Sequence, residues 1–269
     1  MIKSQKILYC HRVVRCLSSV SVYIVRSLKM CRAGVFCFEE IFMNILGSIK
    51  SLTKFEWALW ICSVLTVVTA FVFSGDVFNL VASLIGVTAL IFVAKGLVLG
   101  QVLTVVFSVF YGIISFELRY YGEMITYLGM TAPIALAAVF SWLKHPFKET
   151  AQVEVSRLSA KQKAVLGIGA AVVTVAFYFI LKAMDNSSLI PSTVSVTTSF
   201  LASGLTFFRS PYYALGYSAN DVVLIVLWVI ASAEDISYLP MVFCFVAFLA
   251  NDLYGFFNWK RIEKTQQKD

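Results

Sequence analysis

Two stretches of the chain place aromatic, hydroxyl and carboxylate side chains at matching positions in apolar surroundings. Residues 109–124 read VFYGIISFELRYYGEM and residues 226–241 read VLWVIASAEDISYLPM, and at an offset of 117 they are identical at six positions. A seventh pair is aromatic in both, Tyr111 and Trp228. The face of an aromatic side chain can stack against a flat ring, which is worth about 1–3 kcal/mol per base in nucleic-acid complexes. The repeated pattern therefore predicts two equivalent parts of one ligand site.

Polar residues continue from these stretches at steps of three and four, the spacing that places side chains on one helix face. The first face carries Gln101, Thr104, Ser108, Tyr111 and Ser115. The second face is interrupted by Ile225 and carries Ser218, Asp221, Trp228, Ser232 and Asp235. A third lies within residues 251–258. Polar groups inside lipid need partners or water, so these faces predict the lining of a central cavity. The candidate ligand-binding residues are Gln101, Tyr111, Ser115, Trp228, Ser232, Asn251, Asp252, Tyr254 and Asn258.

Three acidic residues lie near the predicted outer ends of these helices, namely Glu117, Glu234 and Asp235. They are candidates for gating or proton coupling, and the alternative is that they are solvated. Tryptophan at a helix end is typical of the belt at a membrane interface, which is the interpretation for Trp57, Trp60, Trp142 and Trp259. Trp228 lies in the middle of its apolar segment on the polar face, which favours a role in stacking against a ligand.

The composition identifies the class of protein. The 269 residues are 59% hydrophobic and 14% charged, with a mean hydropathy of +0.83, whereas soluble domains are about 45–50% apolar and about 25% charged. The chain is therefore predicted to be an integral membrane protein. Six cysteines without a CxxC pair, and two histidines outside the apolar segments, predict neither a disulfide framework nor a metal site.

Eight apolar segments are predicted to cross the membrane, as helices because the runs are continuously apolar rather than alternating. Pro133, in the middle of the fourth segment, predicts a kink. The segments span residues 57–73, 77–95, 98–116, 121–142, 164–181, 191–208, 217–234 and 237–259.

The basic residues predict the orientation. With eight spans, 20 of the 22 Lys and Arg residues fall on the side of the two termini, and only Arg119 and Lys182 fall on the other. Because cytoplasmic loops carry the excess of Lys and Arg, both termini are expected in the cytoplasm. The net charge of +7 thus reflects membrane topology, and nucleic acid is not an expected partner.

The repeat extends over three segments in each half. Residues 77–142 form the first copy, residues 191–259 the second, and the segment 164–181 links them, because two parallel copies of three helices need one extra crossing. The expected fold is all-α, with a parallel 3+1+3 repeat behind one leading helix, a plan also found in the SWEET transporters. Residues 1–42 are expected to be an extension without function, ahead of a natural start at Met43 and a transporter domain over residues 43–269.

At these residues the sequence resembles the PnuC family of bacterial vitamin transporters, over residues from about 55 to the C-terminus. The resemblance rests on LWVIASAEDISYL and NDLYGFFNW and on the 3+1+3 repeat. In the family pattern Trp-x-x-Trp-x-x-x-Asn, Trp228 matches the second Trp, while Ile225 and Ser232 stand in place of the first Trp and the Asn. The stretch also resembles the family pattern Asn-x-Tyr-Gly-x-x-x-Trp, with Asp252 in place of the Asn and with Tyr254, Gly255 and Trp259 at the other places.

The resemblance implies uptake of nicotinamide riboside by facilitated diffusion through the bacterial cell membrane, a homotrimer, and a cytoplasmic riboside kinase that traps the product for NAD synthesis. No cluster of Arg or Lys suited to phosphate lies within the apolar segments, which favours a nucleoside or vitamin over a nucleotide. Thiamine or a deoxynucleoside remains an alternative cargo, proton coupling an alternative mechanism, and a receptor or scaffold an alternative class. The chain lacks GxxxxGK[ST], HExxH and GxSxG motifs, so we expect no ATP hydrolysis, enzyme activity or cofactor.

Overall fold

The computed structural model describes residues 52–72, 77–117, 120–148, 150–186 and 188–268. The expectation about residues 1–42 therefore lies outside the described residues. Within the described ranges the regular secondary structure is helical, apart from two isolated β-bridges that join Leu97 to Gln152 and Pro146 to Val153. The predicted all-α class is confirmed for this part of the chain.

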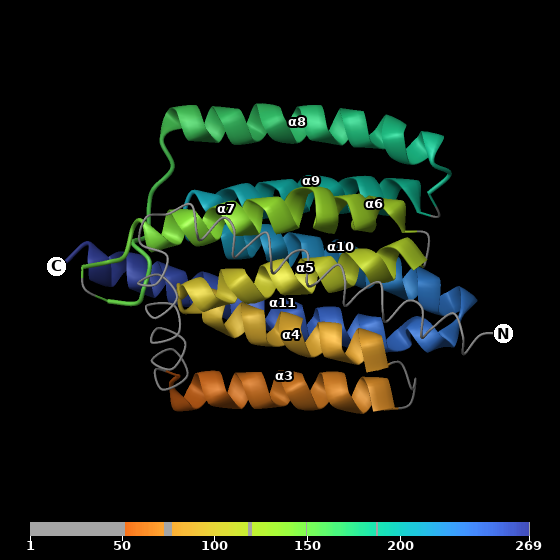
Figure 1. Cartoon of the computed structure of the whole chain (residues 1–269), viewed down its shortest axis with the longest axis horizontal. Helices are drawn as coiled ribbons and strands as arrows, with labels where there is room; N and C mark the ends of the chain where they lie inside the picture. Colours follow the sequence, from red (N-terminus) through yellow and green to blue (C-terminus); the bar gives the residue numbers. More distant parts are fainter. Residues whose placement is uncertain (1–51, 73–76, 118–119, 149, 187, 269) are drawn as a thin grey trace, which may run out of the picture. The chain divides into compact units, whose positions relative to one another are not determined.

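Each predicted apolar segment coincides with a helical stretch (Figure 1). The elements are α3 (Lys54–Val72), α4 (Val77–Ala94), α5 (Val98–Glu117), α6 (Tyr121–Ile125), the π-helical turn η1 (Thr126–Thr131), α7 (Ala132–Leu143), α8 (Ala160–Ala183), α9 (Leu189–Phe207), α10 (Tyr213–Glu234), the 3-10 turn η2 (Ile236–Tyr238) and α11 (Leu239–Gln266).

In the described part of the chain, seven helical stretches are long and apolar enough to cross a membrane, with α6, η1 and α7 forming one and η2 and α11 another. Helix α9 is not among the seven, because eight of its nineteen residues are Ser or Thr. The prediction of eight spans is therefore not confirmed by length and composition.

The helices lie side by side, with α3 and α8 at opposite edges (Figure 1). Helix α3 packs on α4 and α11, and α8 packs mainly on α9. Between these edges α4 packs on α5 and α11, while α10 packs on α9 and α11. Close packing of α9 against α10 depends on Gly216, since a Cβ atom there would lie only 2.9 Å from the Ala202 Cα. The largest buried apolar cluster is formed where α5, η1, α10 and α11 meet.

A π-helical turn interrupts the fourth apolar segment immediately before Pro133. Proline has no N–H to donate and its ring clashes with the preceding turn of an α-helix. The wider turn η1 ends at Thr131 and α7 begins at the next residue, with the proline in its first turn. Such turns are frequent at functional sites, and this one carries the buried hydroxyl groups of Thr126 and Thr131, which have no hydrogen-bond partner among the described residues.

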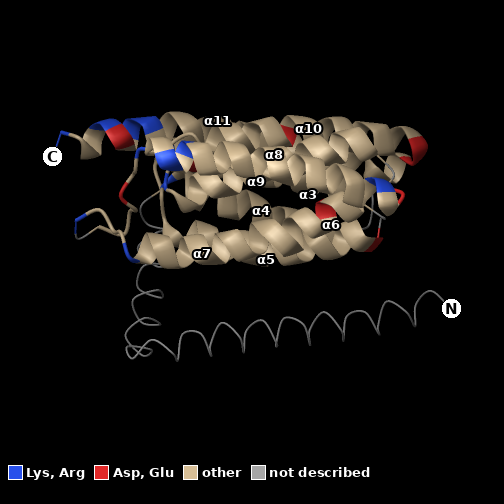
Figure 2. Ribbon diagram, turned by 90° about the horizontal axis from the view of Figure 1, so that it is seen from above, with Lys and Arg blue, Asp and Glu red and all other residues tan. Residues whose placement is uncertain are grey.

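Helix α11 continues seven residues beyond the predicted end at 259, as far as Gln266. Four of the seven added residues are charged, and Glu263 is bound by Lys260 at 3.1 Å and by Arg157 at 2.8 Å. The Gln266 side chain accepts from the Val155 N–H at 2.8 Å and fastens the loop between α7 and α8 to this helix. Figure 2 shows Lys and Arg gathered at this end of the helices, near the C-terminus.

Helices α4 and α9 end in the same way. Gly96 and Arg209 both adopt positive φ, +71° and +57° respectively. The following N–H then reaches back to an earlier carbonyl, from Leu97 to Phe92 at 3.0 Å and from Ser210 to Leu205 at 2.9 Å. This is the Schellman arrangement that closes many helices. The two helix ends that correspond in the predicted repeat are therefore built alike.

Candidate functional site

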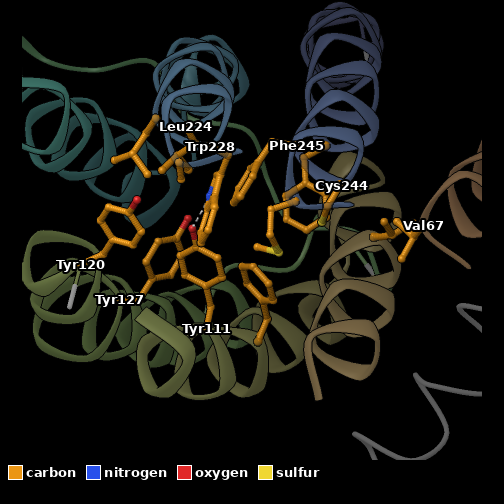
Figure 3. Close-up of a cluster of buried hydrophobic side chains, with 14 of the residues drawn as sticks. Val67, Tyr111, Tyr120, Tyr127, Leu224, Trp228, Cys244 and Phe245 are labelled. Carbon is orange, nitrogen blue, oxygen red and sulfur yellow. Dashed lines mark hydrogen bonds between the residues drawn. The ribbon is translucent and has the colours of Figure 1, made fainter. Parts of the chain in front are cut away.

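The two aromatic residues at equivalent repeat positions contact each other. The indole Nε1–H of Trp228 donates to the Tyr111 hydroxyl at 3.0 Å across 117 residues of sequence. Both side chains are buried, with exposed fractions of 0% for Trp228 and 1% for Tyr111. Trp228 lies on α10 and Tyr111 on α5, so the hydrogen bond joins the two predicted halves (Figure 3).

Further aromatic rings surround this pair (Figure 3). The ring of Tyr127, on η1, lies 4.4 Å from that of Tyr111, and the ring of Phe245, on α11, lies 5.7 Å from it. Tyr120 lies edge-on to Trp228 with 5.4 Å between ring centroids. The cluster brings together apolar faces, phenol hydroxyls and an indole N–H, which are the groups that bind a flat polar ring.

One serine follows each member of the pair by one helical turn. Ser232 donates to the Trp228 carbonyl of its own helix at 2.7 Å. Ser115 follows Tyr111 in the same way, is fully buried, and its hydroxyl has no hydrogen-bond partner in the described part of the chain. The structure thus gathers four of the predicted site residues where α5 meets α10, and Ser115 keeps its hydrogen-bonding capacity.

A second polar layer lies two turns along α10 from Trp228, about 10 Å at 1.5 Å per residue. Here the buried carboxyl groups of Asp221 and Asp252 lie close enough to each other to interact. Beside them, the Asn251 amide donates to the Ser63 hydroxyl at 2.8 Å and so connects α11 to α3. Asp252 and Asn251 were candidate residues. Asp221 was not, although its position seven residues before Trp228 puts both on one face of α10.

A third polar cluster was not predicted. The Ser195 hydroxyl, on α9, lies 3.2 Å from the Glu123 carboxylate and 3.1 Å from the Asn220 side-chain oxygen, and its single proton can go to only one of them. Thr198 also donates to Asn220, at 2.9 Å. All the side chains except that of Thr198 are buried. The available signal was one acidic residue inside a long apolar segment, which by default indicates function in a membrane protein.

Comparison with known proteins identifies the family. The family model described as "Nicotinamide mononucleotide transporter" matches residues 76–261, more than half of the chain. The chain belongs to this family. A curated relative, the nicotinamide riboside transporter PnuC of Neisseria mucosa, is 27% identical over 220 residues, which cover 79% of this chain and 83% of the relative.

A solved structure described as the vitamin B3 transporter PnuC has the same fold, with a TM-score of 0.71 and 24% sequence identity. The match covers 80% of this chain and 94% of the solved one. The resemblance to PnuC noted in the sequence is thus confirmed, and the chain is a multi-pass membrane protein of a transporter family.

In this member of the transporter family, three predicted ligand-binding residues lie away from the aromatic cluster. Gln101 is buried ten residues before Tyr111 on α5, about 15 Å along the helix. Tyr254 donates to Glu56 at 2.8 Å, and Asn258 donates to the Ala94 carbonyl at 2.9 Å. The last two contacts hold α11 against α3 and α4 at the end of the bundle where α4 terminates.

The three acidic residues predicted for gating or coupling are exposed at helix ends in the transporter fold. Glu117 ends α5 and Glu234 ends α10. Asp235 accepts a hydrogen bond from the Ser237 N–H at 2.9 Å. That bond caps the turn η2 and lowers the pKa of the Asp235 carboxyl below its ordinary value. A role of these residues in gating or coupling stays a prediction.

The interpretation of Trp142 and Trp259 as interfacial belt residues is wrong. Their exposed fractions are 1% and 0%, and their rings lie 5.5 Å apart. Trp142 donates to the Thr206 carbonyl at 3.2 Å and Trp259 to the Val93 carbonyl at 2.9 Å, so each fastens to the C-terminal turn of a neighbouring helix. The indole N–H thus finds its partner inside the transporter rather than at the membrane surface. Trp57, by contrast, is 38% exposed.

Proposed function

We propose that this protein carries nicotinamide riboside into the cell by facilitated diffusion across the bacterial cell membrane. The observation that carries the proposal is the buried pair of Tyr111 and Trp228, enclosed by aromatic rings at the junction of the two halves. Family membership and the name of the Neisseria relative support the cargo. A nicotinamide ring would stack within the aromatic cluster, and a ribose would take hydrogen bonds from hydroxyl groups such as that of Ser115. The absence of an ATP-binding motif from the sequence supports a passive mechanism.

The proposal includes α9 as an eighth membrane span. Its hydroxyl groups donate largely to carbonyls one turn back in the same helix, as Thr193 does to Leu189 at 2.7 Å and Thr206 to Ala202 at 2.8 Å. Hydroxyl groups satisfied in this way cost less in lipid than free ones. Packing of α9 between α8, α10 and α7 further limits its contact with lipid.

The proposal also includes the parallel 3+1+3 repeat. Two residues related by a two-fold axis touch each other only where they lie near that axis. Two pairs at the offset of 117 do so, Tyr111 with Trp228 and Trp142 with Trp259. The leading helix α3 and the linking helix α8 also occupy comparable places, each packed on the first helix of a repeat.

The basic residues collected at one end of the bundle support the proposed topology, with both termini in the cytoplasm (Figure 2). The PnuC resemblance further implies a homotrimer and a cytoplasmic riboside kinase. Phosphorylation would add negative charge to the product, and the charged product could no longer leave through a site that accepts the riboside.

Uptake of labelled nicotinamide riboside into liposomes that contain the purified protein, without an ion gradient, tests the proposal. Saturable uptake that thiamine and deoxynucleosides do not inhibit is expected. The Trp228→Ala variant should lose most of this uptake, whereas Trp57→Ala, which alters an exposed tryptophan, should keep it. Inhibition by thiamine alone would reassign the cargo, and uptake that appears only with a proton gradient would overturn the passive mechanism. No flux of any of these solutes would favour a receptor or scaffold.

A further inference from the structure

The buried carboxyl groups fall into two classes. Glu56 is paired with Lys95 at 2.9 Å, and Glu263 is paired with Arg157 and Lys260. Glu123, Asp221 and Asp252 are also buried, with exposed fractions of 0%, 4% and 3%, and no salt bridge reaches them within the described residues. No Lys or Arg is among the buried residues of that part of the chain. The interior therefore holds three carboxyl groups that lack a positive counter-charge.

Each of these three carboxyl groups lies within two helical turns of an aromatic residue of the cluster. Glu123 lies four residues before Tyr127, whose ring packs on Tyr111. Asp221 and Trp228 lie two turns apart on one face of α10, and Asp252 and Phe245 have the same spacing on α11. The acidic groups of α6, α10 and α11 thus border the site proposed for a flat ring.

Buried polar atoms around these carboxyl groups also lack partners. One oxygen of Asp221 and one of Glu123 have no hydrogen-bond partner among the described residues. The same holds for the hydroxyl of Ser218, which is 7% exposed and lies one turn before Asp221 on the same face of α10. The hydroxyl of Thr126, which is fully buried one turn after Glu123, also lacks a hydrogen-bond partner among the described residues. Unpaired buried groups of this kind cost about 1–3 kcal/mol each and indicate a ligand that completes their bonding.

A carboxyl group in this interior is tolerated only with a proton or with a cation beside it, because an isolated buried charge is far more costly. Two buried carboxyl groups that lie beside each other can share one proton, and we infer this arrangement for Asp221 and Asp252 from their burial without a counter-charge. We propose that this pair, together with Glu123, recognises a positively charged group of the ligand, so that the protein selects cationic ring systems over neutral ones. This inference rests on the proposed function and names the charge class of its substrate.

Binding of a cation at this site displaces a proton. The O–H bond of the shared carboxyl group breaks, the proton goes to water, and the carboxylate is left to face the ligand. The titratable groups around the pair are Tyr127 from η1, Tyr213 and Tyr217 from α10, and Cys244 from α11. Helices α4 and α9 contain no titratable side chain. Acidic pH should therefore weaken binding of a cationic ligand and leave that of a neutral ligand unchanged.

Charge separates the candidate cargoes. Nicotinamide riboside carries a pyridinium cation and thiamine a thiazolium cation, whereas deoxynucleosides are neutral at neutral pH. A site with three carboxyl groups that lack a counter-charge favours nicotinamide riboside and thiamine and disfavours deoxynucleosides. The reduced dihydro form of nicotinamide riboside is a sharper probe, because it keeps the riboside and the carboxamide but has lost the ring charge.

The test is the binding of nicotinamide riboside and of its reduced form to the purified full-length protein, at acidic and at alkaline pH. We expect the oxidised form to bind at least about tenfold more tightly at alkaline pH, a preference of about 1.4 kcal/mol, and the preference to shrink on acidification. Asp221→Asn and Asp252→Asn, singly and together, should abolish the preference while the reduced form still binds. That retained binding shows that the variants are folded. Glu154→Gln, which neutralises an exposed loop carboxylate, should leave the preference unchanged.

Equal affinity for the two forms, or a preference that survives in the double variant, would overturn the inference. Its failure is distinguishable from failure of the proposed function. Uptake of nicotinamide riboside without charge preference would leave the function standing and remove the charge site. Selection of thiamine over deoxynucleosides, with no binding of either riboside form, would keep the charge site and reassign the cargo.

Discussion

The hydrogen bond between Trp228 and Tyr111 can be measured with a double-mutant cycle. Tyr111→Phe removes the acceptor and leaves a completely buried indole N–H without a partner. Trp228→Phe removes the donor and also leaves a space where the indole was. The double variant removes both groups, so that the penalty for an unpaired buried group disappears. The two single losses of stability should therefore sum to more than the loss in the double variant.

The expected coupling follows from the surroundings of the bond. Hydrogen bonds between membrane helices couple by about 0.6 kcal/mol on average and by up to about 1.7 kcal/mol. The Trp228–Tyr111 bond measures 3.0 Å and both side chains are buried among aromatic rings. We therefore expect a coupling in the upper half of that range, about 1–1.7 kcal/mol. Tyr111→Phe alone should cost about 1–3 kcal/mol, the penalty for leaving the N–H unpaired.

The assay is reversible unfolding of the four proteins in mixed micelles, followed by binding of nicotinamide riboside. The variants should bind the ligand more weakly, because the hydrogen bond fixes the orientation of the indole. Trp57→Phe provides the control, as Trp57 lies on α3 and its side chain is 38% exposed. Additive losses, within the scatter of about 0.3–0.5 kcal/mol that independent sites show, would refute the assignment of this bond as a link between the two halves.

Three further predictions concern packing, charge and pH. Gly216→Ala should cost about 1–3 kcal/mol, because the new methyl group would lie 2.9 Å from the Ala202 Cα, and chemical unfolding measures this loss. Glu56→Gln should lower the free energy of unfolding by roughly 1–3 kcal/mol, whereas breaking a fully buried ion pair costs about 3–5 kcal/mol. The smaller loss is expected because the Lys95 side chain is 14% exposed. Thermal unfolding in detergent measures it. Acidification should expose the Ser237 N–H, which donates to Asp235, to hydrogen exchange. Because the pKa of Asp235 is lowered in the folded protein, its cap stabilises the fold at pH values above the unfolded pKa. That stabilisation is lost as the pH falls through the folded pKa.

Each of these predictions has a matched control. Gly167→Ala, at a helical position with open space around it, should stabilise the protein by about 0.5–1 kcal/mol; an equal loss at both glycines would contradict the packing argument. Arg157→Gln breaks an ion pair whose Arg side chain is 74% exposed, so a loss as large as that of Glu56→Gln would contradict the distinction by burial. If hydrogen exchange of the Ser237 N–H keeps the same pH dependence in the Asp235→Asn variant, the Asp235 cap is not the cause of that dependence.

Hydropathy located the helices well because a long apolar run has few ways to satisfy its backbone other than as a helix. It failed at the end of α11, where the helix continues through charged residues that pair with one another and with Arg157. It also did not indicate the π-helical turn, since Pro133 predicts a kink but not how the backbone accommodates it. The segment 191–208 was located as a helix, but its excess of Ser and Thr lowers its hydropathy, and the sequence does not show that its threonine hydroxyl groups bond to its own backbone.

The sequence predicted only part of the candidate site, because its contacts join residues that are far apart along the chain. The offset of 117 identified Tyr111 and Trp228 as equivalent, but equivalence does not reveal that the two side chains touch. Asp221 and Asp252 were each recognisable on a polar face of their own helix, but only the packing of α10 against α11 shows that they lie close together. Glu123 is one carboxylate in a long apolar segment, and its bond to Ser195 connects residues 72 positions apart. Contacts of that range depend on tertiary packing and leave no local pattern.

In the proposed repeat, the contact between Tyr111 and Trp228 has a consequence for how two duplicated copies diverge. If both halves descend from one duplicated segment, a residue on the axis first faced an identical copy of itself. Two tryptophans there would each offer an indole N–H and neither could accept it, since indole is only a donor. A tyrosine can accept as well as donate, so replacing one copy creates a matched pair. Such a position favours two copies that differ, because replacing Tyr111 by a second tryptophan would remove the acceptor of the bond.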